Sequence, residues 1–351
     1  MFSTYRKDDV TILLKDITGK LKPLPTKERE KLIQSGKHYS EMLPLEYEPS
    51  AKYLQAYFNA LSGFAKTTAA ATASLAEQIY EEKGADAVLI SLARAGTPIG
   101  ILLKRYIKRR FGVSIPHYTI SIIRGRGIDK NAMAYILARH GARTLQFVDG
   151  WTGKGAIARE LAKDLAEIRG VSAGLGVLSD PAYVAEKCGT HEDFLIASSC
   201  LNSTVSGLLS RTVLSKDLIG KDDFHGAAFY QQLRDKDLSY DFIEAVEKHF
   251  PVKAPTKSDL PKARMQSGLL EVERIAKDFA VRDINLIKPG IGEATRVLLR
   301  RLPWKLLVHS KKDAVRLGHL YQLAKEKGVE IVEYPLTNYL ACGLIRSLAD
   351  S

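Results

Sequence analysis

A glycine-rich turn that carries a carboxylate and a lysine is the stretch of this sequence best suited to chemistry. An apolar run over residues 145–148 ends at Asp149, and the turn Gly150-Trp151-Thr152-Gly153-Lys154-Gly155 follows before a helix-forming segment starts at Ala156. Glycines let main-chain N–H groups converge on an anion, and a helix start adds partial positive charge. The order predicts a sugar-phosphate turn, with a ligand-free strand–helix turn as the alternative.

Two further loops could supply cations to the same ligand. The segment Ala93-Arg94-Ala95-Gly96 joins an apolar run to a helix signal, and its arginine can present a guanidinium to a diphosphate. Residues 122–131 are basic and glycine-rich, which suits a lid that excludes water from a charged group. All three loops follow predicted strands, so one sheet would bring them together. The alternatives are a tight turn and a flexible surface loop.

A serine-rich segment offers a different chemistry. Residues 198–207 gather hydroxyl groups around Cys200 and Asn202. A cysteine nucleophile needs a histidine base and an orienting group, and His140, His191 and His225 are available. No local cysteine-protease signature surrounds Cys200, and free cysteine is most often packed in a core. A helix cap or a pocket lining is therefore expected here, with a cysteine protease as an alternative function.

The elements that must position these loops alternate between strand and helix. Such alternation predicts an α/β fold with a parallel sheet covered on both faces, and ligands at the C-terminal ends of its strands. The pattern predicts strands over 87–92, 117–123, 144–149, 174–178 and 194–197, and helices over 50–83, from an N-cap at Thr97 with Pro98 first, from Asp129 to Arg139, and over 156–168. Residues 1–50 are expected to be irregular, and residues 216–250 polar and helical.

The length of 351 residues exceeds the usual size of one hydrophobic core. Three prolines within residues 251–261 mark a linker. The predicted division is an N-terminal extension over 1–50, an α/β domain over 51–250, a linker over 251–262 and a small α/β domain over 263–351.

The composition describes an ordinary globular protein, with 45% hydrophobic and 26% charged residues. No apolar run approaches the roughly 20 residues that span a bilayer, and the first residues lack the apolar core of a signal peptide. We therefore expect a cytoplasmic protein with no membrane partner. The three cysteines form no CxxC pair, which argues against a disulfide framework or a cysteine-rich zinc site.

The charge indicates a polyanionic partner. Residues 261–351 carry 16 Lys and Arg against 10 Asp and Glu, so about half of the net charge of +12 lies there. In that part a turn over 288–292 leads into a helix with arginines at 296, 300 and 301. A strand over 304–309, a helix over 314–327 ending at Gly328, and a strand over 329–334 follow.

The order of the three loops resembles the type I phosphoribosyltransferase family over roughly residues 85–200. The resemblance implies a Rossmann-like domain that takes phosphoribosyl diphosphate (PRPP) with Mg²⁺ and transfers the ribosyl group to an unidentified acceptor with release of pyrophosphate. It implies catalytic roles for Arg94, Arg124, Arg126, Lys130 and Asp149, with Asp149 also at the metal, and phosphate contacts from Ala93, Ala95, Gly96, Gly150, Trp151, Thr152, Gly153, Lys154 and Gly155. The acceptor is expected near Asp180, Tyr183 and Asn202.

Two departures from that family keep a second function open. The family has two adjacent acids where this chain has Asp149-Gly150, and Gly155 replaces a common threonine. A protein that senses PRPP or a nucleotide without turnover is therefore an alternative to the transferase.

The C-terminal pattern resembles the pelota-type RNA-binding domain, a small three-layer α/β unit, over roughly residues 263–345. That resemblance implies structured RNA as a partner. Its contacts would be Lys288, Gly290, Gly292, Glu293, Arg296 and Arg300. The alternative is a domain that forms dimers or docks on the first domain, and homo-oligomerisation stays open. As a whole the chain resembles a family encoded beside tellurite-resistance and stress-response genes, which also carries a cysteine-protease label.

Overall fold

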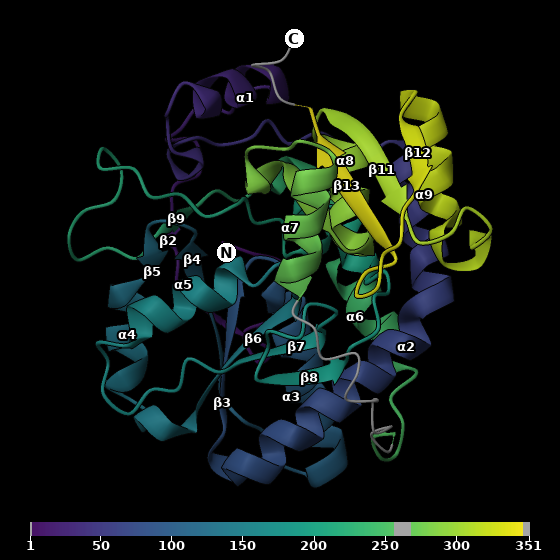
Figure 1. The fold of residues 1–351 in the computed structure, drawn as a ribbon. Helices are drawn as coiled ribbons and strands as arrows, with labels where there is room; N and C mark the ends of the chain where they lie inside the picture. The colour runs from purple at the N-terminus through teal and green to yellow at the C-terminus, as the bar shows by residue number, and fades with distance from the viewer. Residues whose placement is uncertain (1, 256–267, 347–351) are drawn as a thin grey trace.

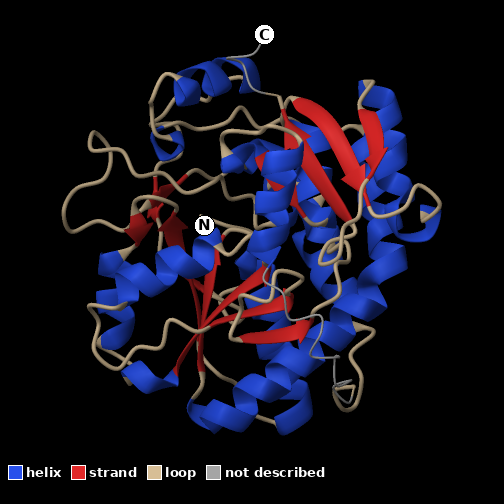
Figure 2. Ribbon diagram, in the orientation of Figure 1, coloured by secondary structure: helices blue, strands red, loops and turns tan. Residues whose placement is uncertain are grey.

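The computed structural model describes residues 2–255 and 268–346. Seven of its strands form a mostly parallel sheet, the central sheet, with helices around it (Figure 2). The strand order is β1-β4-β3-β6-β7-β8, and β5 pairs antiparallel with β4. The expected α/β fold with a mostly parallel sheet is therefore confirmed. The strands are β1 Thr11–Ile12, β3 Val88–Ala93, β4 His117–Ile123, β5 Gly127–Ile128, β6 Leu145–Trp151, β7 Leu175–Ser179 and β8 Lys187–Thr190.

Helices cover both faces of this sheet. Helices α2 (Ala51–Lys83), α3 (Gly96–Phe111) and α6 (Ser239–Glu247) bury their apolar side chains in one core, and α4 (Lys130–Leu137) and α5 (Ala156–Leu165) contribute to a second core. The alanines of α2 let it lie close to the sheet edge, because a Cβ at Gly189 of β8 would clash with the main chain at Ala71. The short 3-10 helices of this part are η1 Tyr39–Glu41, η2 Gly84–Asp86, η3 Ala142–Thr144, η4 Ala197–Ser199, η5 Ser203–Val205 and η6 Gln231–Lys236.

The C-terminal unit is a small α/β domain that docks on the first (Figure 1). Its sheet has the order β10-β13-β11-β12, in which only β11 and β12 are parallel. Apolar side chains of α8 and α9 join the same core as α2. The unit contains α7 Gly268–Asp278, η8 Ile284–Leu286, β10 Ile287–Pro289, α8 Ile291–Arg300, β11 Pro303–Val308, α9 Ala314–Lys327, β12 Glu330–Glu333 and β13 Ala341–Ile345.

The N-terminal segment is more ordered than expected. Strand β1 joins the central sheet, β2 (Lys15–Asp16) pairs in parallel with β9 (Gly226–Ala227), and α1 (Thr26–Gln34) follows. The prediction of an irregular segment was wrong because these short strands find partners far away in the sequence.

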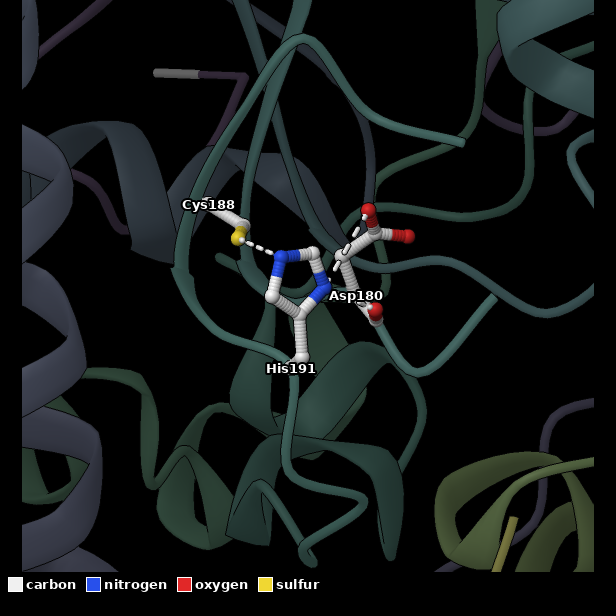
Figure 3. A group of neighbouring side chains, drawn as sticks. All are labelled: Asp180, Cys188 and His191. Atoms are coloured by element: carbon white, nitrogen blue, oxygen red, sulfur yellow. Dashed lines mark hydrogen bonds and ion pairs between the residues drawn. The ribbon is translucent and has the colours of Figure 1, made fainter. Parts of the chain in front are cut away.

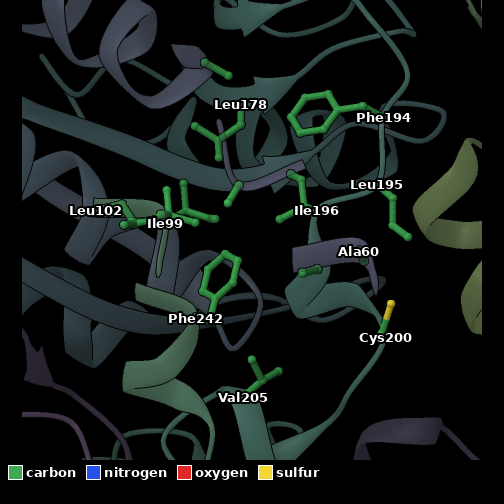
Figure 4. Close-up of a cluster of buried hydrophobic side chains, with 14 of the residues drawn as sticks. Ala60, Ile99, Leu102, Leu178, Phe194, Leu195, Ile196, Cys200, Val205 and Phe242 are labelled. Atoms are coloured by element: carbon green, nitrogen blue, oxygen red, sulfur yellow. The ribbon is translucent and has the colours of Figure 1, made fainter. Parts of the chain in front are cut away.

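Three other local predictions were wrong. Helix α3 starts at Gly96 with Ala95 as its N-cap, because the hydroxyl of Thr97 lies 2.8 Å from that of Thr119 instead of capping the helix. Residues 194–197 form no strand, since their side chains fill the core beside α2 (Figure 4), and β8 takes the edge of the sheet. Residues 216–250 contain only η6 and α6 as helices.

Part of the predicted linker lies outside the described residues. Among the described helices, none combines the length and the apolar character needed to cross a membrane.

Candidate functional site

The predicted phosphate loops do converge at the C-terminal ends of the central strands. Two adjoining cavities, of about 620 and about 420 Å³, lie there between the central domain and the C-terminal unit. The loop Ala93–Ala95 lines the larger cavity, the loop Trp151–Gly155 lines the smaller one, and Asp149 borders both. The topology therefore brings these loops together as expected.

Close packing against residues 148 and 149 explains why residue 96 is a glycine. A Cβ on Gly96 would lie 2.8 Å from the carbonyl oxygen of Val148 and 3.2 Å from a carboxylate oxygen of Asp149. The Asp149 carboxylate accepts a hydrogen bond from the main-chain N–H of Gly150 at 2.8 Å. Burial raises the pKa of this carboxyl group to about 6. Whether Asp149 also holds Mg²⁺ stays a prediction.

Neutral oxygens hold the arginine of the loop over residues 93–96. Arg94 follows a cis peptide bond after Ala93. Its guanidinium donates to the carbonyl oxygen of Leu209 at 2.9 Å and to Oδ1 of Asn202 at 2.8 Å. Asn202, expected near an acceptor, thus lines the same cavity as Arg94.

Lys154 serves the domain interface. Its Nζ donates to the carbonyl oxygens of Ile284 and Ile287, both in the C-terminal unit. Burial lowers the pKa of this amine to about 8. Two of the three N–H donors of the ammonium group are therefore committed to main-chain oxygens, and one is left for the predicted phosphate contact at the smaller cavity.

The predicted lid does not deliver its three cations to the cavities. Arg124 lines the smaller cavity and donates to Asn285 at 3.0 Å. Arg126 instead forms an ion pair with Glu41, and the exposed Lys130 lies 3.7 Å from Glu167. Strand β5 and the helix cap at Asp129 tie the segment to the sheet, so only Arg124 reaches the site.

The residues expected to contact RNA face the first domain. Lys288, Glu293, Arg296 and Arg300 line the larger cavity. The N–H of Ile291, which follows Gly290 at the start of α8, donates to the Asp193 carboxylate at 2.9 Å. Gly292 packs against the Trp151 ring, and the guanidinium of Arg296 lies 4.4 Å from the ring centroid of Trp151. The docking alternative therefore describes this face, which is not an open RNA surface.

A thiol–imidazole pair lies at the edge of the central sheet (Figure 3), and neither of its residues lines either cavity. The Sγ atom of Cys188 on β8 is 3.4 Å from Nε2 of His191. Nδ1 of His191 lies 2.8 Å from the main-chain carbonyl oxygen of Asp180 and 3.8 Å from its carboxylate. The ring of Tyr183 stacks on the imidazole at 4.0 Å. Asp180 and Tyr183, expected at an acceptor site, belong to this cluster instead.

The hydrogen bond at Nδ1 sets the role of the imidazole. A carbonyl oxygen only accepts, so Nδ1 carries the proton and Nε2 presents its lone pair to the thiol. The Asp180 carboxylate is fully buried. It is fixed by the Thr152 hydroxyl and by the N–H groups of Val184 and Ala185, at 3.2 and 3.0 Å. The histidine is therefore held in the orientation of a general base.

The two other cysteines are poor nucleophiles. Cys200 is buried among apolar side chains (Figure 4), and burial raises the pKa of its thiol to about 12. Burial also raises the pKa of Cys342. Cys188 is half-buried and open to solvent in part. The protease alternative predicted from the sequence has Cys200 as its nucleophile. It overlooks the short spacing Cys188-x-x-His191, which is the sequence signal for the thiol–imidazole pair.

The same three side chains form a candidate metal cluster. One ligand atom each from Asp180, Cys188 and His191 lies within 4.8 Å of the others. The Asp180 carboxylate already accepts three hydrogen bonds, which favours an orienting role over a coordinating one.

Fold and site together define a two-domain α/β protein with a thiol–imidazole pair at the sheet edge and a basic cavity between the domains. Residues 3–247 match the family model described as tellurite-like stress resistance cysteine protease StiP, and residues 266–347 match the PELOTA RNA binding domain. The chain belongs to the StiP family. It is 37% identical to a protein of Acinetobacter baylyi named cysteine protease StiP, over 98% of this chain and 94% of that relative. No solved structure matches the chain.

These matches contradict the prediction of a phosphoribosyltransferase. The relative and the family model both carry the name of a cysteine protease, which is a hydrolase. The expected phosphoribosyl transfer was therefore wrong, although the loops that suggested it do converge. That inference failed because a phosphate-suited turn reports binding geometry and does not identify a reaction.

Proposed function

We propose that this chain is a cysteine protease in which Cys188 is the nucleophile, His191 the general base and Asp180 the orienting residue. The observation that carries the proposal is the 3.4 Å approach of Sγ to Nε2, with Nδ1 fixed by Asp180. The family membership independently supports a cysteine protease, and the geometry alone supports the choice of residues.

The geometry suits acyl transfer to sulfur. His191 takes the thiol proton at Nε2, and the resulting thiolate attacks the carbonyl carbon of a peptide bond. The C–N bond then breaks, the amine leaves with the proton from Nε2, and the acyl group stays on Sγ as a thioester. Water, deprotonated by the same imidazole, hydrolyses the thioester and restores the thiol.

Mutagenesis of the cysteines tests this assignment. The full chain is assayed on a fluorescently labelled denatured protein, together with iodoacetamide labelling read by mass spectrometry. Cys188→Ala and His191→Gln should abolish hydrolysis, whereas the matched control Cys200→Ala should retain it. Iodoacetamide should label Cys188 first, because Cys200 and Cys342 are buried. Full activity in Cys188→Ala would rule the assignment out, and loss of activity to a chelator would favour the metal cluster.

Structured RNA is the partner that we propose for the C-terminal unit. The PELOTA match supports RNA binding, but the face of α8 is turned toward the first domain. The exposed side chains at the start of α9 are better placed. Lys311 and Lys312 are exposed there, and Val315 is 94% exposed. Lysines bind phosphates and an exposed apolar side chain can contact an unpaired base.

A further inference from the structure

Seven Arg and Lys side chains line the larger cavity, against five Asp and Glu side chains, and four of the guanidinium groups have no carboxylate partner in an ion pair among the described residues. These four arginines are Arg29 of α1, Arg94 and Arg211 of the central domain, and Arg300 of α8. Among the ion pairs within residues 2–255 and 268–346, none joins any of these four guanidinium groups to a carboxylate. Their documented partners are neutral oxygens of Leu209, Asn202 and Ser199, and the Tyr39 ring.

Three of the five acids that line this cavity form ion pairs with other cations, and Glu48 is one of them, with Lys236 at 3.1 Å. Glu30 pairs with Arg301 at 2.9 Å, and Glu293 pairs with Arg296 at 3.2 Å. Glu46 accepts from the N–H and the hydroxyl of Ser203 at 3.0 and 2.8 Å, and its charge offsets part of the positive charge at Arg300.

Burial and mutual repulsion make the charged state of these arginines costly. Burial, followed by repulsion from Arg296 and Arg94, lowers the pKa of Arg300 to about 9. Burial likewise lowers the pKa of Arg211 to about 10, with Arg29 as the next cause. The Nε atom of Arg29 is buried without a hydrogen bond. A buried charge of this kind requires a compensating partner of opposite sign.

We propose that the larger cavity is a binding site for an oligophosphate, either free or carried by a small organic molecule. A guanidinium group can donate two parallel hydrogen bonds to the oxygens of one phosphate. The site presents guanidinium groups from three parts of the chain. The volume of about 620 Å³ is in the range of small-molecule sites and does not admit folded RNA. The lining excludes Asp180, Cys188 and His191, so the site is separate from the proposed protease centre.

Such a ligand would join three parts of the protein. Arg29 comes from the N-terminal segment, Arg94 and Arg211 from the central domain, and Arg300 from the C-terminal unit. Phosphate oxygens between them would offset the repulsion that now acts across the domain boundary. Ligand binding should therefore raise the thermal stability of the whole chain.

Calorimetry and thermal unfolding of the full chain test the site with tripolyphosphate, ATP and adenosine as probes. Tripolyphosphate and ATP should bind and raise the unfolding temperature, while adenosine should do neither. Tighter binding of ATP than of tripolyphosphate would show that an organic carrier adds contacts, and equal affinity would show that the phosphate chain suffices. Absence of binding by both phosphates would overturn the proposal.

Arginine variants distinguish a built site from general basicity. Arg300→Gln and Arg211→Gln should each weaken binding at least about tenfold. Each should also raise the unfolding temperature without ligand, because an unpaired buried charge is removed. The exposed control Arg169→Gln should change neither quantity. Unchanged affinity in both variants, or binding of a 5′-triphosphorylated oligonucleotide without binding of ATP, would overturn the proposal. Retained phosphate binding in Cys188→Ala separates this site from the protease centre.

Discussion

Replacing Gly189 with alanine tests the packing that positions Cys188. Gly189 lies on β8 directly after the proposed nucleophile, and a Cβ there would be 2.3 Å from the carbonyl oxygen and 2.7 Å from the Cα of Ala71 on α2. Ordinary contacts of a Cβ start at 3.4 Å. Both obstructing atoms belong to the main chain and cannot rotate away, so α2 and β8 must separate by about 1 Å.

That separation has a cost in stability and a larger one in reactivity. Forcing a methyl group into a packed interface typically costs about 1–3 kcal/mol. A displacement of about 1 Å at a catalytic group can lower the rate on the order of a hundredfold. Gly189→Ala should therefore destabilise the chain by about 1–3 kcal/mol and reduce Cys188-dependent hydrolysis far more than this loss of stability explains.

Gly318→Ala is the matched control, since nothing lies within 4 Å of a Cβ at that position on α9. It should stabilise the helix by up to about 1 kcal/mol and leave hydrolysis unchanged. Urea denaturation at 25 °C measures the free energy of unfolding, and hydrolysis is measured well below the denaturation midpoint. Equal stability of Gly189→Ala and the wild type would refute the packing argument. A destabilised variant with full hydrolysis would refute the link to Cys188.

Two further outcomes are expected. Burial raises the pKa of Asp149 and of Asp193 from 3.8 to about 6, so the folded chain holds both protons more tightly than the unfolded chain. The free energy of unfolding should then fall as the pH rises from about 4 to about 6. The fall should be less steep for Asp149→Asn, because of the two carboxyl groups only Asp193 still releases its proton. Equal pH slopes of the unfolding free energy for this variant and the wild type, measured by urea denaturation, would contradict the prediction. The double change Lys311→Gln and Lys312→Gln should weaken binding to a structured RNA and reduce its salt dependence, whereas Lys163→Gln with Lys216→Gln should not, as measured by filter binding across a salt series.

Strand–helix alternation was enough to predict the central sheet and most of its helices. Helix α2 and strand β4 lie within a residue or two of the predicted limits, because long amphipathic or apolar segments carry strong local signals. The N-terminal strands could not be predicted in this way. Strands β1 and β2 are two residues each, and they form only because β4 and β9, more than 100 residues away, supply hydrogen-bond partners.

The candidate site shows a similar division. The convergence of the loops at residues 93–96 and 149–155 follows from parallel-sheet topology, and the sequence therefore predicted it. Commitment of Lys154 to carbonyl oxygens of the C-terminal unit depends on how two domains pack, which no local pattern reports. The partnership of Cys188 with His191 depends on the bend at His191 directly after β8, which brings the imidazole beside the thiol of the strand.

One hydrogen-bonded chain links the two sites. The N–H of Thr152, in the loop that lines the smaller cavity, donates to Ser179, and its hydroxyl donates to the Asp180 carboxylate. Asp180 in turn fixes Nδ1 of His191 through its carbonyl oxygen. A movement of the 150–155 loop therefore acts on the residue that orients the proposed base. The two cavities adjoin and share Arg211, Lys288 and Arg296, and the loop over residues 151–155 lines the smaller of them. The contact between the smaller cavity and the proposed protease centre therefore runs through Thr152 and Asp180.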